Sequence, residues 1–312
     1  MKKTVLLFSG QGAQTVGMGR DLFERYPTAS RLFKEADSIL GLDLSKVIFE
    51  GPEEKLTQTE YAQPAIFLMS WIAMKLLQES IPGFEFQGAA GLSLGEFTAL
   101  AAAEAFSFEE GLILVRKRGT YMQEACDATR GGMAAIIGLP EEVVREICAE
   151  TGIELANLNC PGQIVISGES SRVVSACELA RAKGAKRALP LAVAGAYHSS
   201  LMRSAQSKLK DALKEVKITV PTIPVVSNVT ALPHEKNADV IRDTLVRQVT
   251  SSVLFESSLR WLIDNGFTRF VEVGPGTVLC GFLKRISKEV EILNVADTVS
   301  LEKTVAVLNQ IN

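Results

Sequence analysis

The chain has 312 residues, 47% of them hydrophobic and 22% charged, and a formal net charge of -3. This length can bury a large core in one big domain or two, and the composition is ordinary for a soluble globular protein. The small net charge gives no reason to expect nucleic acid as a partner. The longest apolar stretch, residues 88–106, contains Glu96 and Glu104, which excludes a membrane span there.

The cysteines and the N-terminus indicate a cytoplasmic protein. The five cysteines are scattered, and none forms a Cys-x-x-Cys pair or a metal-type spacing with a histidine. We therefore expect reduced thiols and no metal site. The apolar run at residues 5–8 is too short for the hydrophobic region of a signal peptide.

The N-terminal third begins with a predicted buried strand at residues 4–8, which leads into a turn-rich loop at residues 9–14. This loop does not fit a phosphate-binding motif, because Thr15 stands where the last glycine would be required. Helices are predicted over residues 21–40 and 63–78.

The most informative stretch is the pentad Gly91-Leu92-Ser93-Leu94-Gly95. It follows a small apolar segment predicted as a strand and precedes a helix-forming run at residues 96–105. Strand, sharp turn and helix form the setting of a nucleophile elbow, in which glycines remove side chains that would collide. The pattern predicts that Ser93 presents its hydroxyl at a helix N-terminus, where backbone N–H groups favour a developing oxyanion.

The chain then changes its pattern of elements. A helix over residues 108–124 is followed by a predicted βαββαβ series between residues 131 and 193. Its strands are expected at residues 133–139, 153–157, 163–167 and 188–193, and its helices at 140–151 and 170–183. This order is that of the ferredoxin-like split unit. We expect a small domain of residues 128–195 inserted into a large domain of residues 1–127 and 196–312.

The remaining elements again alternate between helices and strands. Helices are predicted over residues 198–217, 238–250, 255–265 and 277–286. Strands are predicted over residues 224–228, 268–273 and 292–295. Such alternation predicts an α/β fold with a mostly parallel sheet that is covered on both faces.

A nucleophilic serine needs a general base, and the chain contains only two histidines. His198 lies among small residues where a loop leads into a helix, whereas His234 lies in a polar loop, so His198 is the favoured base. The only aspartate between Ser93 and His198 is Asp127, which precedes the inserted domain. A Ser–His dyad is therefore expected, with a neutral acceptor fixing the imidazole tautomer.

Two neighbouring cations of the helix over residues 108–124 have different interpretations. Lys117 is typical of a solvated helix face. Arg118 is either structural or a bidentate partner for a carboxylate, which would select an acyl group with a free carboxylate. The residues alone leave this alternative open.

Several further motifs occur in a fixed order along the chain. They are Phe8-Ser9-Gly10-Gln11-Gly12-Ala13-Gln14, Thr57-Gln58-Thr59-Glu60-Tyr61-Ala62-Gln63-Pro64, the pentad with Glu96, Arg118-Gly119 with Met122-Gln123, residues 157–163, His198-Ser199-Ser200-Leu201-Met202, Val225-Val226-Ser227-Asn228 and Glu272-Val273-Gly274-Pro275-Gly276. Together they resemble the malonyl-CoA:acyl-carrier-protein transacylases, which load malonyl groups for fatty-acid synthesis. The resemblance covers residues 8 to about 285.

The resemblance implies a role for each matching position. Ser93 would carry the acyl group, His198 would be its base, and the backbone N–H groups of Gln11 and Leu94 would form the oxyanion hole. Arg118 would pair with the malonyl carboxylate, and the backbone carbonyl of Gln248 would orient His198. The implied fold is a hydrolase-like α/β core with a ferredoxin-like insert.

The implied reaction is a ping-pong transfer of malonyl from malonyl-CoA to the phosphopantetheine thiol of acyl carrier protein, with no permanently bound cofactor. Because carrier proteins are typically acidic, a basic rim is expected at the mouth of the site. Its candidates are Lys117, Lys186, Arg187, Lys284 and Arg285.

One residue departs from the family pattern. The family usually has histidine at the second position of the pentad, and this chain has Leu92. That histidine is not the base, so the mechanism should survive, with one polar group fewer beside Ser93. The alternatives are a polyketide acyltransferase acting in trans, a serine esterase or thioesterase, and a non-catalytic module that binds carrier protein.

Overall fold

The computed structural model describes residues 2–310, and its larger unit is built on a five-stranded sheet. The strand order is β7-β2-β1-β8-β9, and every neighbouring pair is parallel. The strands are β1 (Lys3–Phe8), β2 (Gly88–Gly91), β7 (Val225–Val226), β8 (Phe267–Val273) and β9 (Glu291–Val295). Phe8 is level with both Gly91 and Val273, so three strands end at one edge of the sheet.

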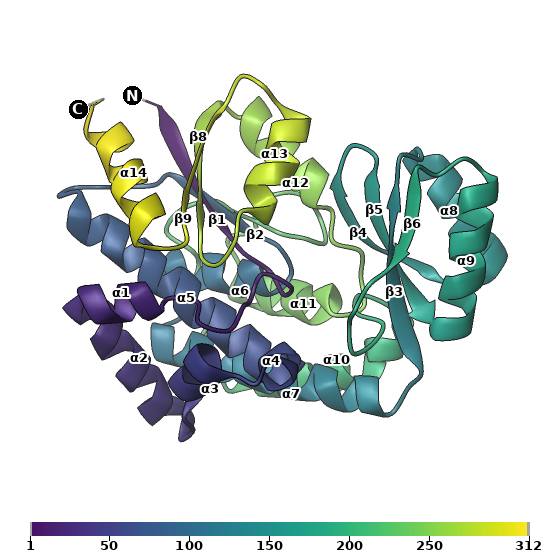
Figure 1. The fold of residues 1–312 in the computed structure, drawn as a ribbon, viewed down its shortest axis with the longest axis horizontal. Coiled ribbons are helices and arrows are strands. Elements are labelled where there is room, and N and C mark those ends of the chain that lie inside the picture. Colours follow the sequence, from purple (N-terminus) through teal and green to yellow (C-terminus); the bar gives the residue numbers. More distant parts are fainter. Residues whose placement is uncertain (1, 311–312) are drawn as a thin grey trace.

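Helices cover both faces of this sheet (Figure 1). Side chains alternate between faces along a strand, so Leu6 and Phe8 of β1 pack in one core while Val5 and Leu7 pack in another. The helices of this unit are α1 (Arg20–Arg25), α2 (Pro27–Leu40), α3 (Leu44–Glu50), α4 (Glu53–Thr57), α5 (Thr59–Ser80), α6 (Leu94–Ala102), α7 (Phe108–Asp127), α10 (Arg203–Lys214), α11 (Ala238–Gln248), α12 (Phe255–Asp264), α13 (Val278–Ile286) and α14 (Thr298–Asn309). A short 3-10 helix, Ser200–Met202, precedes α10.

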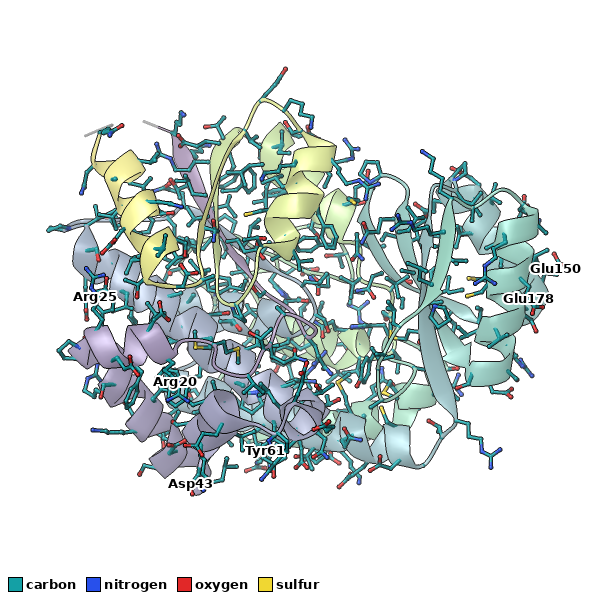
Figure 2. All side chains as sticks on the ribbon, viewed as in Figure 1. Arg20, Arg25, Asp43, Tyr61, Glu150 and Glu178 are labelled. Carbon is teal, nitrogen blue, oxygen red and sulfur yellow. The ribbon has the colours of Figure 1, made fainter. Side chains whose placement is uncertain are left out.

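The smaller unit is a four-stranded antiparallel sheet with two helices on one face. Its strands lie in the order β4-β5-β3-β6. They are β3 (Gly131–Ile137), β4 (Glu154–Cys160), β5 (Gln163–Glu169) and β6 (Arg187–Pro190), and the helices are α8 (Glu141–Thr151) and α9 (Ser170–Ala182). Glu150 of α8 and Glu178 of α9 lie on the outer side, away from the larger unit (Figure 2).

Backbone hydrogen bonds join the two units at strand β4. The Leu158 N–H donates to the Val253 carbonyl at 2.9 Å, and the Val253 N–H donates to the Ala156 carbonyl at 2.8 Å. The Ser252 hydroxyl also donates to the Leu155 carbonyl at 2.6 Å. The segment between α11 and α12 therefore continues the edge of the small sheet.

The structure confirms the coarse prediction of an α/β fold with a parallel sheet, and it corrects several elements. The helix predicted over residues 21–40 is two helices, because Tyr26 is extended and Pro27 starts α2. The helix predicted over residues 198–217 begins only at the 3-10 turn, because His198 has a φ of 58°. Helices α3, α4 and α14 were not predicted.

The predicted division into residues 1–127, 128–195 and 196–312 includes residues 1, 311 and 312, which lie outside the described range. All five cysteines are buried and free of disulfides. No helix within residues 2–310 has both the length and the apolar character needed to cross a membrane.

Candidate active site

The sharp turn at Ser93 joins β2 to α6, as the pentad predicted. Ser93 has φ 53° and ψ -101°, a conformation that is strained for a residue with a side chain. A Cβ atom at Gly91 would lie 2.0 Å from the Gly95 carbonyl carbon, and one at Gly95 would lie 2.1 Å from the Phe8 carbonyl oxygen. Both glycines are therefore required by close backbone approach, which lets Ser93 project from the turn.

His198 lies within hydrogen-bonding distance of the Ser93 hydroxyl. Its Nε2 atom is 2.8 Å from Ser93 Oγ, and its Nδ1 atom is 2.9 Å from the backbone carbonyl oxygen of Gln248. Because a carbonyl only accepts, Nδ1 carries the proton and Nε2 is left free to accept the proton of Ser93. His234, the other histidine, contacts Glu96 at 2.7 Å instead.

Arg118 is a buried cation that contacts the same hydroxyl. It is 1% exposed, and its Nη2 donates to Ser93 Oγ at 3.0 Å and to Gln248 Oε1 at 2.9 Å. Its Nη1 donates to Gln63 Oε1 at 2.8 Å. Burial lowers the pKa of Arg118 to about 10, against the opposing effect of the Glu96 carboxylate, so the guanidinium stays charged at neutral pH.

The environment of His198 favours its neutral form. Burial first, and then the charge of Arg118, lower the pKa of the imidazole to about 4. At neutral pH the ring is therefore available as a proton acceptor. The pKa values of His198 and Arg118 are both lowered mainly by burial, and the charge of Arg118 also acts on His198. The two side chains beside Ser93 are therefore electrostatically coupled.

The two predicted oxyanion-hole N–H groups belong to Leu94, the next residue after Ser93, and to Gln11, which lines the same cavity as Ser93. Leu94 is the first residue of α6, where the helix does not use the N–H, and Gln11 lies in the loop that follows β1. Within residues 2–310, neither N–H donates to another group. The Gln11 side chain donates to Thr59 Oγ1 and Tyr197 OH, each at 3.3 Å, which anchors its loop.

A second group of polar residues, which belong to the sequence motifs but had no predicted role, contacts the turn at Ser93. Asn228 Oδ1 accepts from the Ser93 N–H at 2.7 Å, and Asn228 Nδ2 donates to the Gly91 carbonyl at 2.8 Å. Glu96 is fully buried and accepts from the Asn228 N–H at 3.1 Å. A carboxylate directly after the pentad in an otherwise apolar helix was the available signal for this group.

Gln248 has more contacts than its predicted role required. Besides its carbonyl contact with His198, its Nε2 donates to the Ser93 carbonyl at 2.9 Å and to Glu96 Oε2 at 2.6 Å. Its Oε1 accepts from Arg118. Gln248 therefore contacts Ser93, His198 and Arg118.

Ser93 and His198 line a cavity of about 270 Å³ between the two units. Residues of the small sheet form one wall, and their side chains lie on the face opposite α8 and α9: Met133, Ala135, Asn157, Asn159, Gln163 and Val165. Leu92 and Phe282 of the larger unit line the cavity as well. Asn159 Oδ1 is buried and has no partner among residues 2–310, so it offers an acceptor to a ligand.

The predicted rim cations are exposed side chains. Arg285 of α13 donates to Gln163 Oε1 at 2.8 Å, which places it beside the cavity wall. Lys117 is exposed on α7, next to the buried Arg118. For all five cations, the role at the mouth of the site remains a prediction.

Comparisons with known proteins identify the family. The family described as acyl transferase domain matches residues 5–308. The malonyl CoA-acyl carrier protein transacylase of Bacillus subtilis (strain 168) is 45% identical, covering 100% of this chain and 99% of that protein. The acyl-carrier-protein-S-malonyltransferase structure from Bartonella henselae is 40% identical, with a TM-score of 0.93 and coverage of 98% and 99%.

A further solved structure shows a relative with a bound partner. It is a malonyl-transacylase in complex with a type II polyketide acyl-carrier protein, 38% identical, with a TM-score of 0.94 and coverage of 98% and 99%. The family match spans nearly all of the chain, and His198 and Arg118 meet at the Ser93 hydroxyl within it. The chain therefore belongs to the acyl transferase family, among the malonyl CoA-acyl carrier protein transacylases.

Proposed function

We propose that this chain transfers malonyl from malonyl-CoA to the phosphopantetheine thiol of acyl carrier protein through a malonyl-Ser93 ester. The observation that carries the proposal is the meeting of His198 and Arg118 at Ser93 Oγ. The base activates the hydroxyl, and the buried cation matches the free carboxylate of a malonyl group. The relatives named as malonyl transacylases support the same substrate.

In the first half-reaction, His198 Nε2 takes the Ser93 proton as Oγ attacks the thioester carbonyl carbon. The tetrahedral oxyanion is stabilised by the N–H groups of Gln11 and Leu94, each contributing on the order of a few kcal/mol. The carbon–sulfur bond then breaks, and His198 gives its proton to the departing coenzyme A sulfur. The products are malonyl-Ser93 and the free thiol.

The second half-reaction reverses these roles. The carrier-protein thiol loses its proton to His198, and its sulfur attacks the ester carbonyl of malonyl-Ser93. The Ser93 oxygen leaves and recovers the proton from His198. The apolar side chains of the cavity wall, including Met133 and Val165, limit the access of water, which would otherwise hydrolyse the ester.

Arg118 is proposed to bind the malonyl carboxylate. Its Nε has no hydrogen-bond partner within residues 2–310, although the atom is buried, so the guanidinium retains an unused donor. An acetyl group offers no carboxylate to this cation. The resulting difference favours malonyl over acetyl.

The finer fold assignment is also proposed. A hydrolase-like core of residues 1–127 and 196–312 is supported by the parallel sheet with a nucleophile turn after β2. A ferredoxin-like insert of residues 128–195 is supported by the order β4-β5-β3-β6 with two helices on one face. The cavity then lies between core and insert.

We further propose that the chain works in the cytoplasm without a permanently bound cofactor. The two half-reactions need only groups of the chain itself: a nucleophile, a base and hydrogen-bond donors. The acyl group arrives on malonyl-CoA and leaves on a carrier protein, whose acidic surface would face cations such as Arg285.

A second candidate is a polyketide acyltransferase acting in trans, because one similar structure holds a polyketide carrier protein. The two candidates share their chemistry and differ in the carrier protein. A serine esterase or thioesterase is the less favoured alternative, since it needs no buried cation at the nucleophile.

The deciding experiment incubates the chain with malonyl-CoA and measures the mass of the Ser93 peptide. We expect one malonyl group on Ser93, its removal by holo acyl carrier protein, and its transfer to the carrier thiol. Ser93→Ala is the control and should acquire no adduct. An unmodified Ser93 would contradict the transferase, and loss of the adduct to water alone would favour the esterase.

A further inference from the structure

The buried carboxylate of Glu96 lies in the first turn of α6 and is 0% exposed. Its Oε2 accepts from the Gln248 amide at 2.6 Å and from the Asn228 N–H at 3.1 Å. Its Oε1 is 2.7 Å from His234 Nε2. The proposed half-reactions use neither Glu96 nor His234, so this buried pair requires a separate explanation.

Glu96 determines which way the Gln248 side-chain amide points. The Gln248 amide turns its NH2 group toward Glu96, because its Nε2 donates to the carboxyl oxygen Oε2 at 2.6 Å. This NH2 group also donates to the Ser93 carbonyl at 2.9 Å. A rotated amide would bring its oxygen against both acceptors and its NH2 group against the Arg118 guanidinium.

The amide orientation in turn determines where Arg118 is held. With Nε2 directed at Glu96, Gln248 Oε1 faces Arg118 and accepts from its Nη2 at 2.9 Å. The same Nη2 lies 3.0 Å from Ser93 Oγ. The contacts therefore run in one continuous series from Glu96 through Gln248 to Arg118 and Ser93.

His234 holds the far oxygen of this carboxylate. Its side chain is 1% exposed, and its backbone N–H donates to the Val225 carbonyl at 2.8 Å, which fixes it beside β7. Glu96 thus has donors on both oxygens, and its position is set from the sheet. Such a fully hydrogen-bonded network holds its members in one arrangement.

We propose that Glu96, held by His234, is a positioning residue that orients the Gln248 amide and thereby Arg118, so that Ser93 prefers acyl groups with a carboxylate. This proposal rests on the proposed malonyl transfer. Glu96 touches neither the acyl group nor the reacting atoms; it acts through Gln248.

The test compares acylation of Ser93 by malonyl-CoA and by acetyl-CoA in Glu96→Gln, at one pH and with the fold checked by circular dichroism. We expect the malonyl-to-acetyl ratio of kcat/KM to fall by about tenfold or more, since the glutamine no longer fixes the amide. Glu104→Gln makes the same chemical change at an exposed position of this segment and should keep the wild-type ratio. An equal loss with both donors, or an unchanged ratio, would overturn the proposal.

A double-mutant cycle tests the path through Gln248. Gln248→Met removes the amide but keeps the backbone carbonyl that contacts His198, and it should lower the ratio as Glu96→Gln does. In the Gln248→Met background, Glu96→Gln should cause no further fall in the ratio. A further fall would show that Glu96 acts by another route.

Two outcomes keep this inference distinct from the proposed function. If wild-type Ser93 acquires no malonyl group, the function itself is wrong. If it does, and Glu96→Gln fails to fold, Gln248→Met alone decides, because an unchanged ratio in that variant overturns the series of contacts.

Discussion

Arg118 and His198 approach the hydroxyl of Ser93 together, with Nη2 at 3.0 Å and Nε2 at 2.8 Å from Oγ. A permanent cation therefore lies beside the group that must accept a proton. Burial first, and then the charge of Arg118, lower the pKa of His198 and keep the imidazole neutral at neutral pH.

The first prediction concerns the pH dependence of Ser93 acylation. Because the pKa of His198 is lowered to about 4 by burial and by Arg118, the acid limb of kcat/KM should lie near pH 4, well below the usual histidine value of about 6.5. Arg118→Gln should move this limb to higher pH. Stopped-flow acylation between pH 3.5 and 8 measures it, and a limb near pH 6.5 in the wild type would refute the assignment.

The second prediction concerns stability. The folded chain holds His198 with a lowered pKa of about 4, whereas the unfolded chain titrates near about 6.5. Between these values the unfolded chain binds more protons, so the contribution of neutral His198 is complete above about pH 6.5 and declines as the pH falls toward 4. Denaturant unfolding of His198→Gln should show a smaller loss of stability over this range than the wild type does.

The third prediction concerns the turn. Gly95→Ala would place a Cβ 2.1 Å from the Phe8 carbonyl oxygen, which is backbone and cannot move aside. We expect destabilisation by about 1–3 kcal/mol or more and loss of Ser93 acylation. Gly281→Ala in α13 is the matched control, because no atom lies within 4 Å of its Cβ, and it should stabilise the helix by up to about 1 kcal/mol. Similar unfolding midpoints for the two variants would count against the close packing.

The fourth prediction separates Arg118 from its neighbour. Arg118→Ala should lower malonyl transfer about 100-fold more than acetyl transfer, which corresponds to a charged hydrogen bond of about 3 kcal/mol. Lys117→Ala, one residue away and exposed, should leave the malonyl-to-acetyl ratio unchanged. Equal losses with both donors in Arg118→Ala would make Arg118 structural.

The fifth prediction concerns Leu92, which stands where the family usually has histidine. Its side chain lines the cavity and packs partly against apolar neighbours, while His198 is the histidine within hydrogen-bonding distance of Ser93 Oγ. Leu92→His should therefore change the rate of Ser93 acylation by less than about fivefold. A larger change in single-turnover acylation would assign this position a direct part in the reaction.

The local parts of the site could be predicted from sequence, because short-range geometry determines them. Glycines on either side of Ser93 and the helix after it predict the turn, and the lack of a suitable acid before His198 predicts a neutral acceptor. Glu96 contacts Asn228 and Gln248, which lie 132 and 152 positions further along the chain. Periodicity carries no information about such pairs, so this network appeared only in the structure.

The elements that differ from the prediction have identifiable physical causes. The break at Tyr26 depends on Pro27, which excludes a helical conformation at the residue before it. His198 adopts a φ of 58° because its ring must reach both Ser93 and Gln248, and this tertiary requirement overrides the helical tendency of the residues that follow. The short helices α3 and α4 lack a sequence long enough to show a period.

The hydrogen bonds between β4 and Val253 have a consequence for how substrates arrive. Separating the two units would break these backbone hydrogen bonds, so the hydrogen bonds oppose any change in the width of the cavity between the units. A cavity of about 270 Å³ admits a slender group and not a folded domain, so a partner protein can reach Ser93 only through an extended arm.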